Sequence, residues 1–163
     1  ESYGVLHHLA DPYAGWRVLL SLLRPGGVMR LGLYSALARS EIVRARATIA
    51  DEELGAKAKD IRRFRQRVMK PDEAEGCSFI LNTGDFFSTS GCRDLLFHVQ
   101  EHRLFLGEIA TFLHANDLKF LGFEIDDVVL EVYRLRFPED PAATNLDNWE
   151  EFERERPETF GEM

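Results

Sequence analysis

Two short histidine motifs are the parts of this sequence whose residue types could do chemistry. His7 and His8 are adjacent near the start of the chain, and His98-Val99-Gln100-Glu101-His102 lies farther along it. A neutral imidazole with an ordinary pKa of about 6.5 can accept a proton from a hydroxyl or an amine. We therefore interpret His7 and His8 as candidate catalytic bases. The alternative is structural: one ring packs under the next helix and the other caps a turn.

The second motif has the H-x-x-E-H spacing of inverted zincin peptidases. On a helix, His98 and His102 would share one face for a zinc ion, and Glu101 could activate a zinc-bound water. A zinc site needs a third protein ligand, and the available carboxylates, which are Glu131, Glu150 and Glu151, lie in no supporting motif. A zinc hydrolase is therefore an alternative hypothesis, and no metal is predicted as the first choice.

A strongly basic segment runs from Lys57 to Lys70, with Asp60 as its one acidic residue. The apolar residues Ile61, Phe64 and Val68 recur in it at helical spacing, which predicts an amphipathic helix with a basic face. Such a face could bind an anionic partner, so a noncatalytic interaction module is a further alternative. No aromatic residue is interleaved on the basic face, and for this reason we do not expect nucleic acid as a partner.

Composition limits the class of protein. The 163 residues carry a net charge of -8, and Glu139 to Met163 alone hold nine acidic and two basic residues. No apolar run reaches the roughly 18 residues that span a bilayer, and no signal segment opens the chain. Cys77 and Cys92 form no C-x-x-C motif, which favours reduced thiols. We expect a cytoplasmic protein with no membrane partner.

Apolar periodicity gives the expected elements. Asp11-Pro12 opens a helix that ends near Leu23, a broken helix covers 35–70, and shorter helices follow at 91–98, 106–116, 127–137 and 148–156. The largely apolar runs 28–34 and 118–125 are typical of buried strands. Strands that alternate with amphipathic helices predict an α/β fold with a parallel sheet.

The first 34 residues resemble a known family. An apolar run through Val5-Leu6-His7-His8 leads through a helix into Leu23-Arg24-Pro25-Gly26-Gly27 and the next apolar run. This order is similar to the central crossover of class I S-adenosylmethionine-dependent methyltransferases. The segments 85–88, 92–102, 120–124, 145–149 and 157–160 resemble the carboxy-terminal half of bacterial methyltransferases often described with tetratricopeptide repeats.

The resemblance implies a partial Rossmann-like methyltransferase sheet, with the later strands only and flanking helices. It implies one domain over 1–163, the carboxy-terminal part of a methyltransferase domain, with 36–105 as a helical insertion or a cover of the acceptor pocket. S-adenosylmethionine is the implied cofactor, and the methyl acceptor is not identified. The family's glycine-rich cofactor loop has no counterpart in this sequence, so we expect a fragment that is inactive alone. The oligomeric state is left open.

Ligands of open α/β sheets lie beyond the carboxyl ends of the strands. By the resemblance, Ser2, Tyr3 and Gly4 are candidates for cofactor binding, and Gly4 would let the backbone approach the ligand closely. The candidates for acceptor binding share polar or aromatic character: Tyr34, Ser35, Phe86, Arg93, His98, Glu101 and His102.

Overall fold

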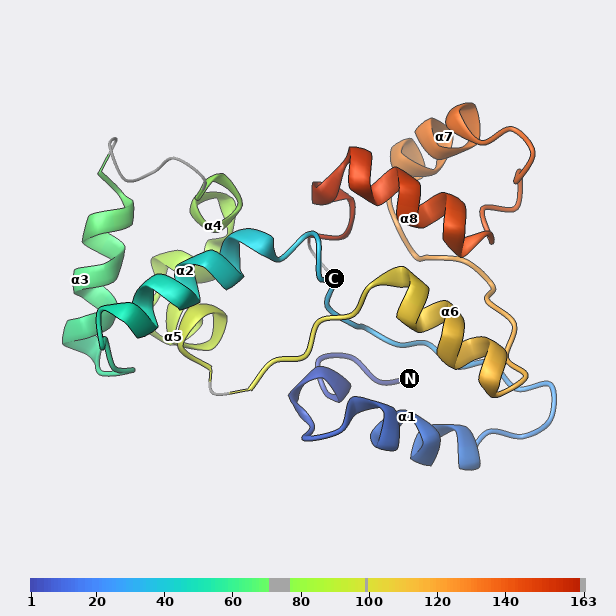
Figure 1. Ribbon diagram of the computed structural model, residues 1–163, viewed down its shortest axis with the longest axis horizontal. Coiled ribbons are helices and arrows are strands. Elements are labelled where there is room, and N and C mark those ends of the chain that lie inside the picture. The colour runs from blue at the N-terminus through green and yellow to red at the C-terminus, as the bar shows by residue number, and fades with distance from the viewer. Residues whose placement is uncertain (71–76, 99, 162–163) are drawn as a thin grey trace. The chain divides into compact units, whose positions relative to one another are not determined.

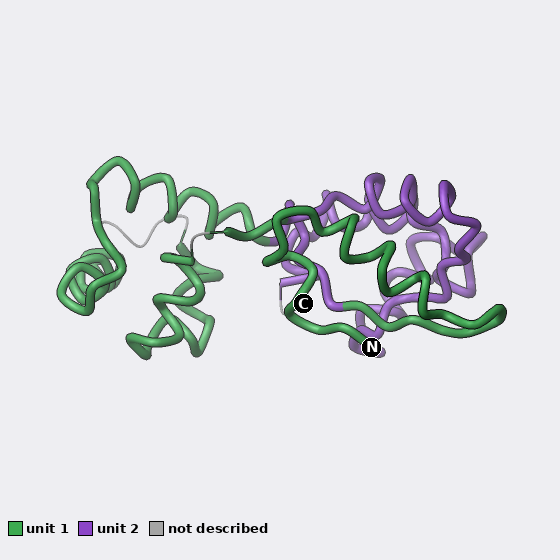
Figure 2. Tube along the Cα trace, turned by 90° about the horizontal axis from the view of Figure 1, so that it is seen from below, with its two compact units in different colours: residues 1–31, 39–102 green, residues 32–38, 103–163 purple. Residues whose placement is uncertain are grey.

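The computed structural model describes residues 1–70, 77–98 and 100–161, and helices are the regular elements of this part of the chain. The chain forms two compact units (Figure 2). Unit 1 comprises 1–31 and 39–102, and unit 2 comprises 32–38 and 103–163. Each unit has a hydrophobic core of its own.

Unit 1 contains five α-helices and two short 3₁₀ segments in its described residues. In chain order these are η1 (Leu6–His8), α1 (Pro12–Ser21), α2 (Ser40–Asp51), α3 (Ala58–Val68), α4 (Ser78–Asn82), η3 (Gly84–Phe87) and α5 (Thr89–Phe97). Helix α5 packs against α2, α3 and η3 (Figure 1). This arrangement encloses a core of aliphatic and phenylalanine side chains.

Local sequence explains where these helices begin and which faces they bury. The Asp11 carboxylate accepts the Ala14 backbone N–H at 3.0 Å, and Pro12 is the first residue of α1. In α3 the predicted stripe of Ile61, Phe64 and Val68 is buried. The predictions of helices at these two places are confirmed.

The two cysteines of unit 1 differ in environment. Neither forms a disulfide. Cys92 is fully buried in the core, and its burial raises the pKa of the thiol to about 11. Cys77 is half-buried. The Cys92 thiol is therefore protonated throughout the neutral range.

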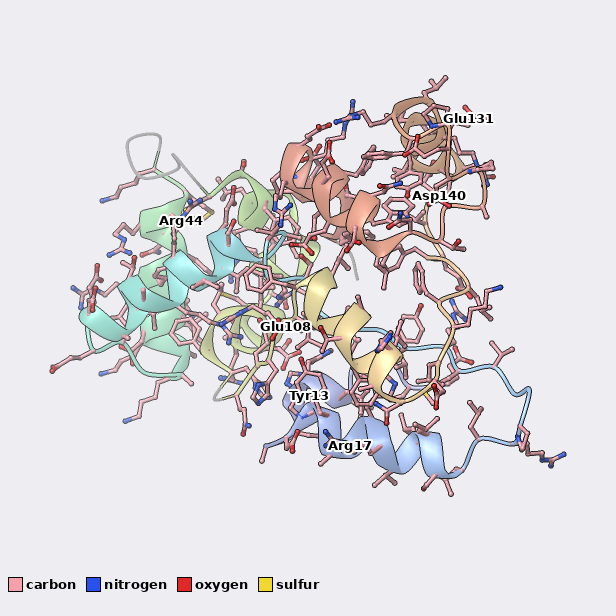
Figure 3. The ribbon with its side chains drawn as sticks, turned by 45° about the vertical axis from the view of Figure 1, so that its right-hand side comes forward. Tyr13, Arg17, Arg44, Glu108, Glu131 and Asp140 are labelled. Atoms are coloured by element: carbon pink, nitrogen blue, oxygen red, sulfur yellow. The ribbon has the colours of Figure 1, made fainter. Side chains whose placement is uncertain are left out.

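Unit 2 contains α6 (Leu106–Ala115), α7 (Asp127–Arg136), α8 (Leu146–Glu155) and η4 (Pro157–Phe160). Helix α8 packs against α6 and η4. Polar side chains fix the helix starts: the Glu108 carboxylate (labelled in Figure 3) accepts the Phe105 backbone N–H at 2.8 Å at the start of α6. The helices predicted over 106–116, 127–137 and 148–156 are confirmed to within two residues at each end.

Aromatic rings form the centre of unit 2. Trp149 is fully buried and stacks on Tyr133, with ring centroids 3.9 Å apart. Its Nε1–H donates to the Ala143 carbonyl at 2.9 Å. The Tyr133 hydroxyl donates to Asp140 (labelled in Figure 3) at 2.6 Å. The polar atoms of both rings thus have partners inside an otherwise apolar core.

The prediction of an α/β fold with a Rossmann-like sheet is wrong for the described residues. They contain two isolated parallel bridges, Ser2 with Leu31 in unit 1 and Ser35 with Leu104 in unit 2, and no sheet. A sheet requires a ladder of repeated hydrogen bonds between strands. A single bridge does not make one.

The two apolar runs that predicted strands have other roles. In 118–125, Gly122 takes a φ of +132°, which interrupts the extended backbone. Phe123 of this run packs against Trp149 and Phe160, with centroids 5.3 and 4.6 Å apart. In the run 28–34, Val28 is 70% exposed and so is not buried between layers. The run 118–125 contributes Phe120, Phe123 and Ile125 to the core of unit 2, and neither run is part of a sheet in the described residues.

Among the described residues, none of the helices combines the length and the apolar character that crossing a membrane requires. The prediction of one domain over 1–163, with 36–105 as an insertion or cover, stays a prediction.

Candidate functional site

A cluster of four histidines is the candidate site, and all of its residues belong to unit 1. Segment η1 carries His7 and His8, and the stretch that follows α5 carries His98 and His102. The His102 backbone N–H donates to the His7 carbonyl at 2.8 Å, which ties the two segments together. Residues about 90 positions apart in the sequence thus meet at one place.

Gln100 organises the polar contacts of this cluster. Its backbone carbonyl lies 3.1 Å from His8 Nδ1 and 2.7 Å from His98 Nδ1. Its side-chain Nε2 lies 3.0 Å from the Leu9 carbonyl and 3.2 Å from His102 Nε2. A carbonyl can only accept, so His8 donates through Nδ1. His98 Nδ1 lies between this carbonyl and the Gln100 backbone N–H, which is 3.2 Å away and can donate to it. The amide has two hydrogens to donate, so His102 accepts at Nε2.

The rings of three histidines are in contact. The His7 and His8 centroids are 4.4 Å apart at an interplanar angle of 72°, and the His8 and His98 centroids are 4.3 Å apart. His7 is 3% exposed, and His8 and His98 are half-buried. Burial lowers the pKa of His7 to about 4, with a further lowering by the charge of His8. His7 is therefore neutral at pH 7.

Glu101 lies in the same stretch and is held by two arginines. Its carboxylate accepts from Arg39 Nε at 3.0 Å, from Arg39 Nη2 at 2.9 Å and from Arg46 Nη2 at 3.0 Å. The Glu101 side chain is 1% exposed and that of Arg39 is 6% exposed. Because both carboxylate oxygens are engaged, Glu101 fixes this stretch against α2 and is not placed to activate a water.

The geometry gives no support to a zinc site. Helix α5 ends at Phe97, so His98 and His102 do not share a helical face, and Val99 between them lies outside the described residues. Glu131 (labelled in Figure 3), Glu150 and Glu151 belong to unit 2. Among the described residues, no three His, Cys, Asp or Glu side chains are grouped so as to hold a metal ion.

The candidate cofactor residues lie just before η1. The Ser2 backbone N–H donates to the Arg30 carbonyl at 2.9 Å. The Tyr3 ring is 51% exposed, and the Arg30 guanidinium carbon lies 5.0 Å from its centroid. Gly4 has a φ of +66°, a conformation that disfavours other residues. These residues are accessible, and three positions separate Gly4 from the first histidine of the cluster.

The other predicted acceptor residues do not join the histidine cluster within unit 1. Phe86 is fully buried in the core, and Arg93 is exposed on α5, where its Nε donates to the Ala56 carbonyl at 3.1 Å. Tyr34 and Ser35 belong to unit 2. There the Ser35 hydroxyl donates to the buried Glu153 carboxylate and accepts the Ala38 backbone N–H at 3.0 Å.

Three residues of the site were missed from the sequence. Arg39 is the N-cap residue of α2 and Arg46 lies seven positions later in the helix, a spacing of about two turns, which was the available signal. For Gln100 the sequence offered no signal beyond its place within the histidine motif. Its role comes from the backbone carbonyl, and every residue type has one.

Comparison with known proteins gives little on function. No family model matches the chain. Over 47 residues, 29% of this chain, it is 45% identical to an uncharacterized protein of Synechococcus sp.. The matched stretch covers 11% of that relative, so the chain spans only a small part of the curated relative it matches.

Proposed function

We propose that this chain supplies the acceptor side of a methyl transfer from S-adenosylmethionine, with His8 as the group that accepts a proton. The choice of methyl donor rests on the resemblance of the sequence to class I methyltransferases. The proposal does not include the Rossmann-like sheet that the same resemblance implied. The observation that carries the proposal is the contact of His8 Nδ1 with the Gln100 carbonyl at 3.1 Å.

This contact determines which nitrogen of His8 can act as a base. Because Nδ1 donates to the carbonyl, the lone pair of the neutral ring is on Nε2. A hydrogen bond at one ring nitrogen also fixes the orientation of the ring. His7, buried and neutral beside it, adds no positive charge that would oppose the uptake of a proton by His8.

The proposed reaction balances in atoms and charge. The acceptor's lone pair forms a bond to the methyl carbon as the bond between that carbon and the sulfonium sulfur breaks. The sulfur leaves as a neutral thioether, and the acceptor's proton moves to Nε2 of His8. Alignment and the exclusion of water are the main requirements of such a displacement. Glu101 and its two arginines keep the histidine stretch in place.

On the donor side, Ser2, Tyr3 and Gly4 form the proposed contact with the cofactor. The exposed Tyr3 ring offers a flat surface, and nothing lies within 4 Å of the point where a Cβ at Gly4 would sit. The acceptor class is unassigned. The two cysteines outside any disulfide fit a reducing compartment, and we place the reaction in the cytoplasm.

The test measures equilibrium binding of tritiated S-adenosylmethionine to the full-length protein. We expect Gly4→Val to weaken binding about tenfold, because valine is strained at positive φ next to the donor. Gly26→Val is the matched control, since Gly26 also has a positive φ, of +74°, and open space around it. Methyl transfer to a phenol, a primary amine and a carboxylic acid is then assayed with His8→Gln.

One of these three acceptors is expected to be methylated by the wild-type protein. The proposal predicts that His8→Gln methylates this acceptor more slowly and that the pH dependence of the methylation rate changes. Failure of the full-length protein to bind the methyl donor would overturn the proposal. Equal loss of binding in the two glycine variants would remove Gly4 from the donor site. An unchanged pH profile in His8→Gln would remove His8 as the base.

A further inference from the structure

A cavity of about 380 Å³ lies against the C-terminal half of α3, away from the histidine residues. Its lining comes from α3, from Lys70 just after this helix and from the turn that follows α2, and the described lining residues are Glu52, Arg63, Phe64, Gln66, Arg67 and Lys70. Pockets of roughly 300–1,000 Å³ are the usual size for small ligands. The histidine cluster and the proposed methyl transfer make no use of it.

Helical spacing explains why these side chains converge. Positions 63, 66 and 67 follow the i, i+3, i+4 pattern and so lie along one face of α3, and Lys70 comes two residues after the helix ends at Val68. Arg63, Gln66 and Lys70 are exposed. Guanidinium, amide and ammonium groups are all hydrogen-bond donors, which suits a ligand with several acceptor oxygens.

Arg67 is held in a defined place within this lining. Its guanidinium is ion-paired with Glu52, and its central carbon lies 5.2 Å from the centroid of the Phe64 ring. The Arg67 side chain is 24% exposed. An arginine already oriented by a carboxylate and a ring loses less freedom when it binds a ligand.

The charge of the lining selects for an anion. Among the described residues of the lining, three are cations, Arg63, Arg67 and Lys70, and one is a carboxylate, Glu52. The C-terminus of a helix is equivalent to about half a negative charge, which is small against these cations. A phosphate monoester carries about 1.5 to 2 negative charges at pH 7 and matches the excess positive charge.

We propose that this cavity binds a phosphate group, either free phosphate or the phosphate of a small phosphorylated metabolite. Arg63 and Lys70 supply contacts to the phosphate oxygens, and Arg67, held by Glu52 and Phe64, supplies a positive charge in a fixed place. Paired N–H donors of arginine match the geometry of phosphate oxygens.

The test compares adjacent arginines of α3. The protein is titrated by calorimetry with inorganic phosphate and with glycerol 3-phosphate at constant ionic strength. We expect one site per chain and binding weakened about tenfold in Arg63→Gln and in Lys70→Gln. Arg62→Gln is the matched control: Arg62 is also exposed, but it is not among the described residues that line the cavity. Its affinity should stay close to that of the wild type.

Binding of inorganic phosphate and of glycerol 3-phosphate with similar affinity would indicate a site for free phosphate, whereas tighter binding of the ester would indicate a metabolite site. No binding of either probe would overturn the proposal. Equal loss in Arg62→Gln and Arg63→Gln, together with binding of a poly-uridine oligonucleotide, would also overturn it in favour of an extended basic surface for nucleic acid. Because the three positions are exposed, circular dichroism is expected to show an unchanged fold.

Discussion

The two units of this chain differ in the balance of their charges and in the side chains that they bury. Unit 1 has 14 Lys and Arg residues against 13 Asp and Glu, and it buries a carboxylate between two arginines. Unit 2 has 6 against 15, and its centre is a cluster of aromatic rings. The side chains that could do chemistry or bind an anion lie in unit 1, where acidic and basic residues are nearly balanced, whereas the core of unit 2 consists mostly of aromatic rings.

The comparison also extends to one buried titratable group in each unit, His7 in unit 1 and Glu153 in unit 2. In unit 1 burial lowers the pKa of a base, His7. In unit 2 burial raises the pKa of an acid, Glu153, although the hydrogen bond from Ser35 opposes this change. Both shifts favour the neutral form. The two shifts make the free energy of unfolding depend on pH in opposite directions. The stability of each unit as a function of pH can therefore distinguish the two.

The largest expected effect is from Trp149→Ala in unit 2. The change removes a fully buried ring that contacts Tyr133, Phe152 and Phe160, and leaves a cavity. We expect a loss of about 3–5 kcal/mol in the free energy of unfolding. Urea denaturation combined with hydrogen exchange by mass spectrometry measures it and locates it. The control is Leu135→Ala on α7, where the side chain is 83% exposed.

Loss of protection confined to amides of unit 2 would show that the units unfold separately. Equal loss of protection in both units would show a single cooperative unfolding transition. The two units would then have no separate stabilities to compare.

A smaller effect is expected from acid in unit 1. His7 is surrounded by His8, His98, Arg39 and Glu101, and its pKa falls from 6.5 to about 4 on folding. The unfolded state therefore binds more protons between these values, so stability is full above pH 6.5 and is lost as the pH falls towards 4. A shift of this size corresponds to about 3 kcal/mol.

His7→Phe should flatten this part of the curve, measured as the urea midpoint of unit 1 at a series of pH values. His114→Gln, an exposed histidine of unit 2, should leave it unchanged. A wild-type midpoint that stays level from pH 6.5 to 4 would contradict the neutral state of His7.

The smallest effect is expected from Glu153→Gln in unit 2. Because the folded pKa of Glu153 is raised above 4.5, unit 2 loses stability as the pH rises from 4.5 through the folded value. Glutamine retains an oxygen that can accept from the Ser35 hydroxyl. We expect a gain on the order of 1 kcal/mol at neutral pH, seen as a higher urea midpoint. A loss at neutral pH would mean that the carboxylate is stabilised by its surroundings.

Sequence patterns predicted the helices well because their signals are local. The Asp11-Pro12 start, the stripe of Ile61, Phe64 and Val68, and the acidic helix near the carboxyl end all depend on residues within a few turns of each other. The strand predictions failed because a short apolar run does not distinguish a buried strand from a loop that packs on a core. Phe123 is such a case, since its ring completes the aromatic cluster from a non-helical segment.

The candidate site was predicted in part for the same physical reason. Residue type identified His7, His8, His98 and His102 one motif at a time. Their meeting depends on a backbone contact across 95 positions, from the His102 N–H to the His7 carbonyl, which no local pattern encodes. Arg39 and Arg46 were missed because a pair of arginines on a helix face is ordinary until the carboxylate between them is known.

The buried Cys92 gives unit 1 a built-in reporter. Its thiol is protonated and shielded while α5 stays packed, so a maleimide can reach it only during opening, whereas the half-buried Cys77 offers a separate handle nearby. Unit 2 has no cysteine in its sequence. The rate at which maleimide labels Cys92 therefore reports the opening of unit 1 alone. The measurement uses the natural sequence and needs no added cysteine.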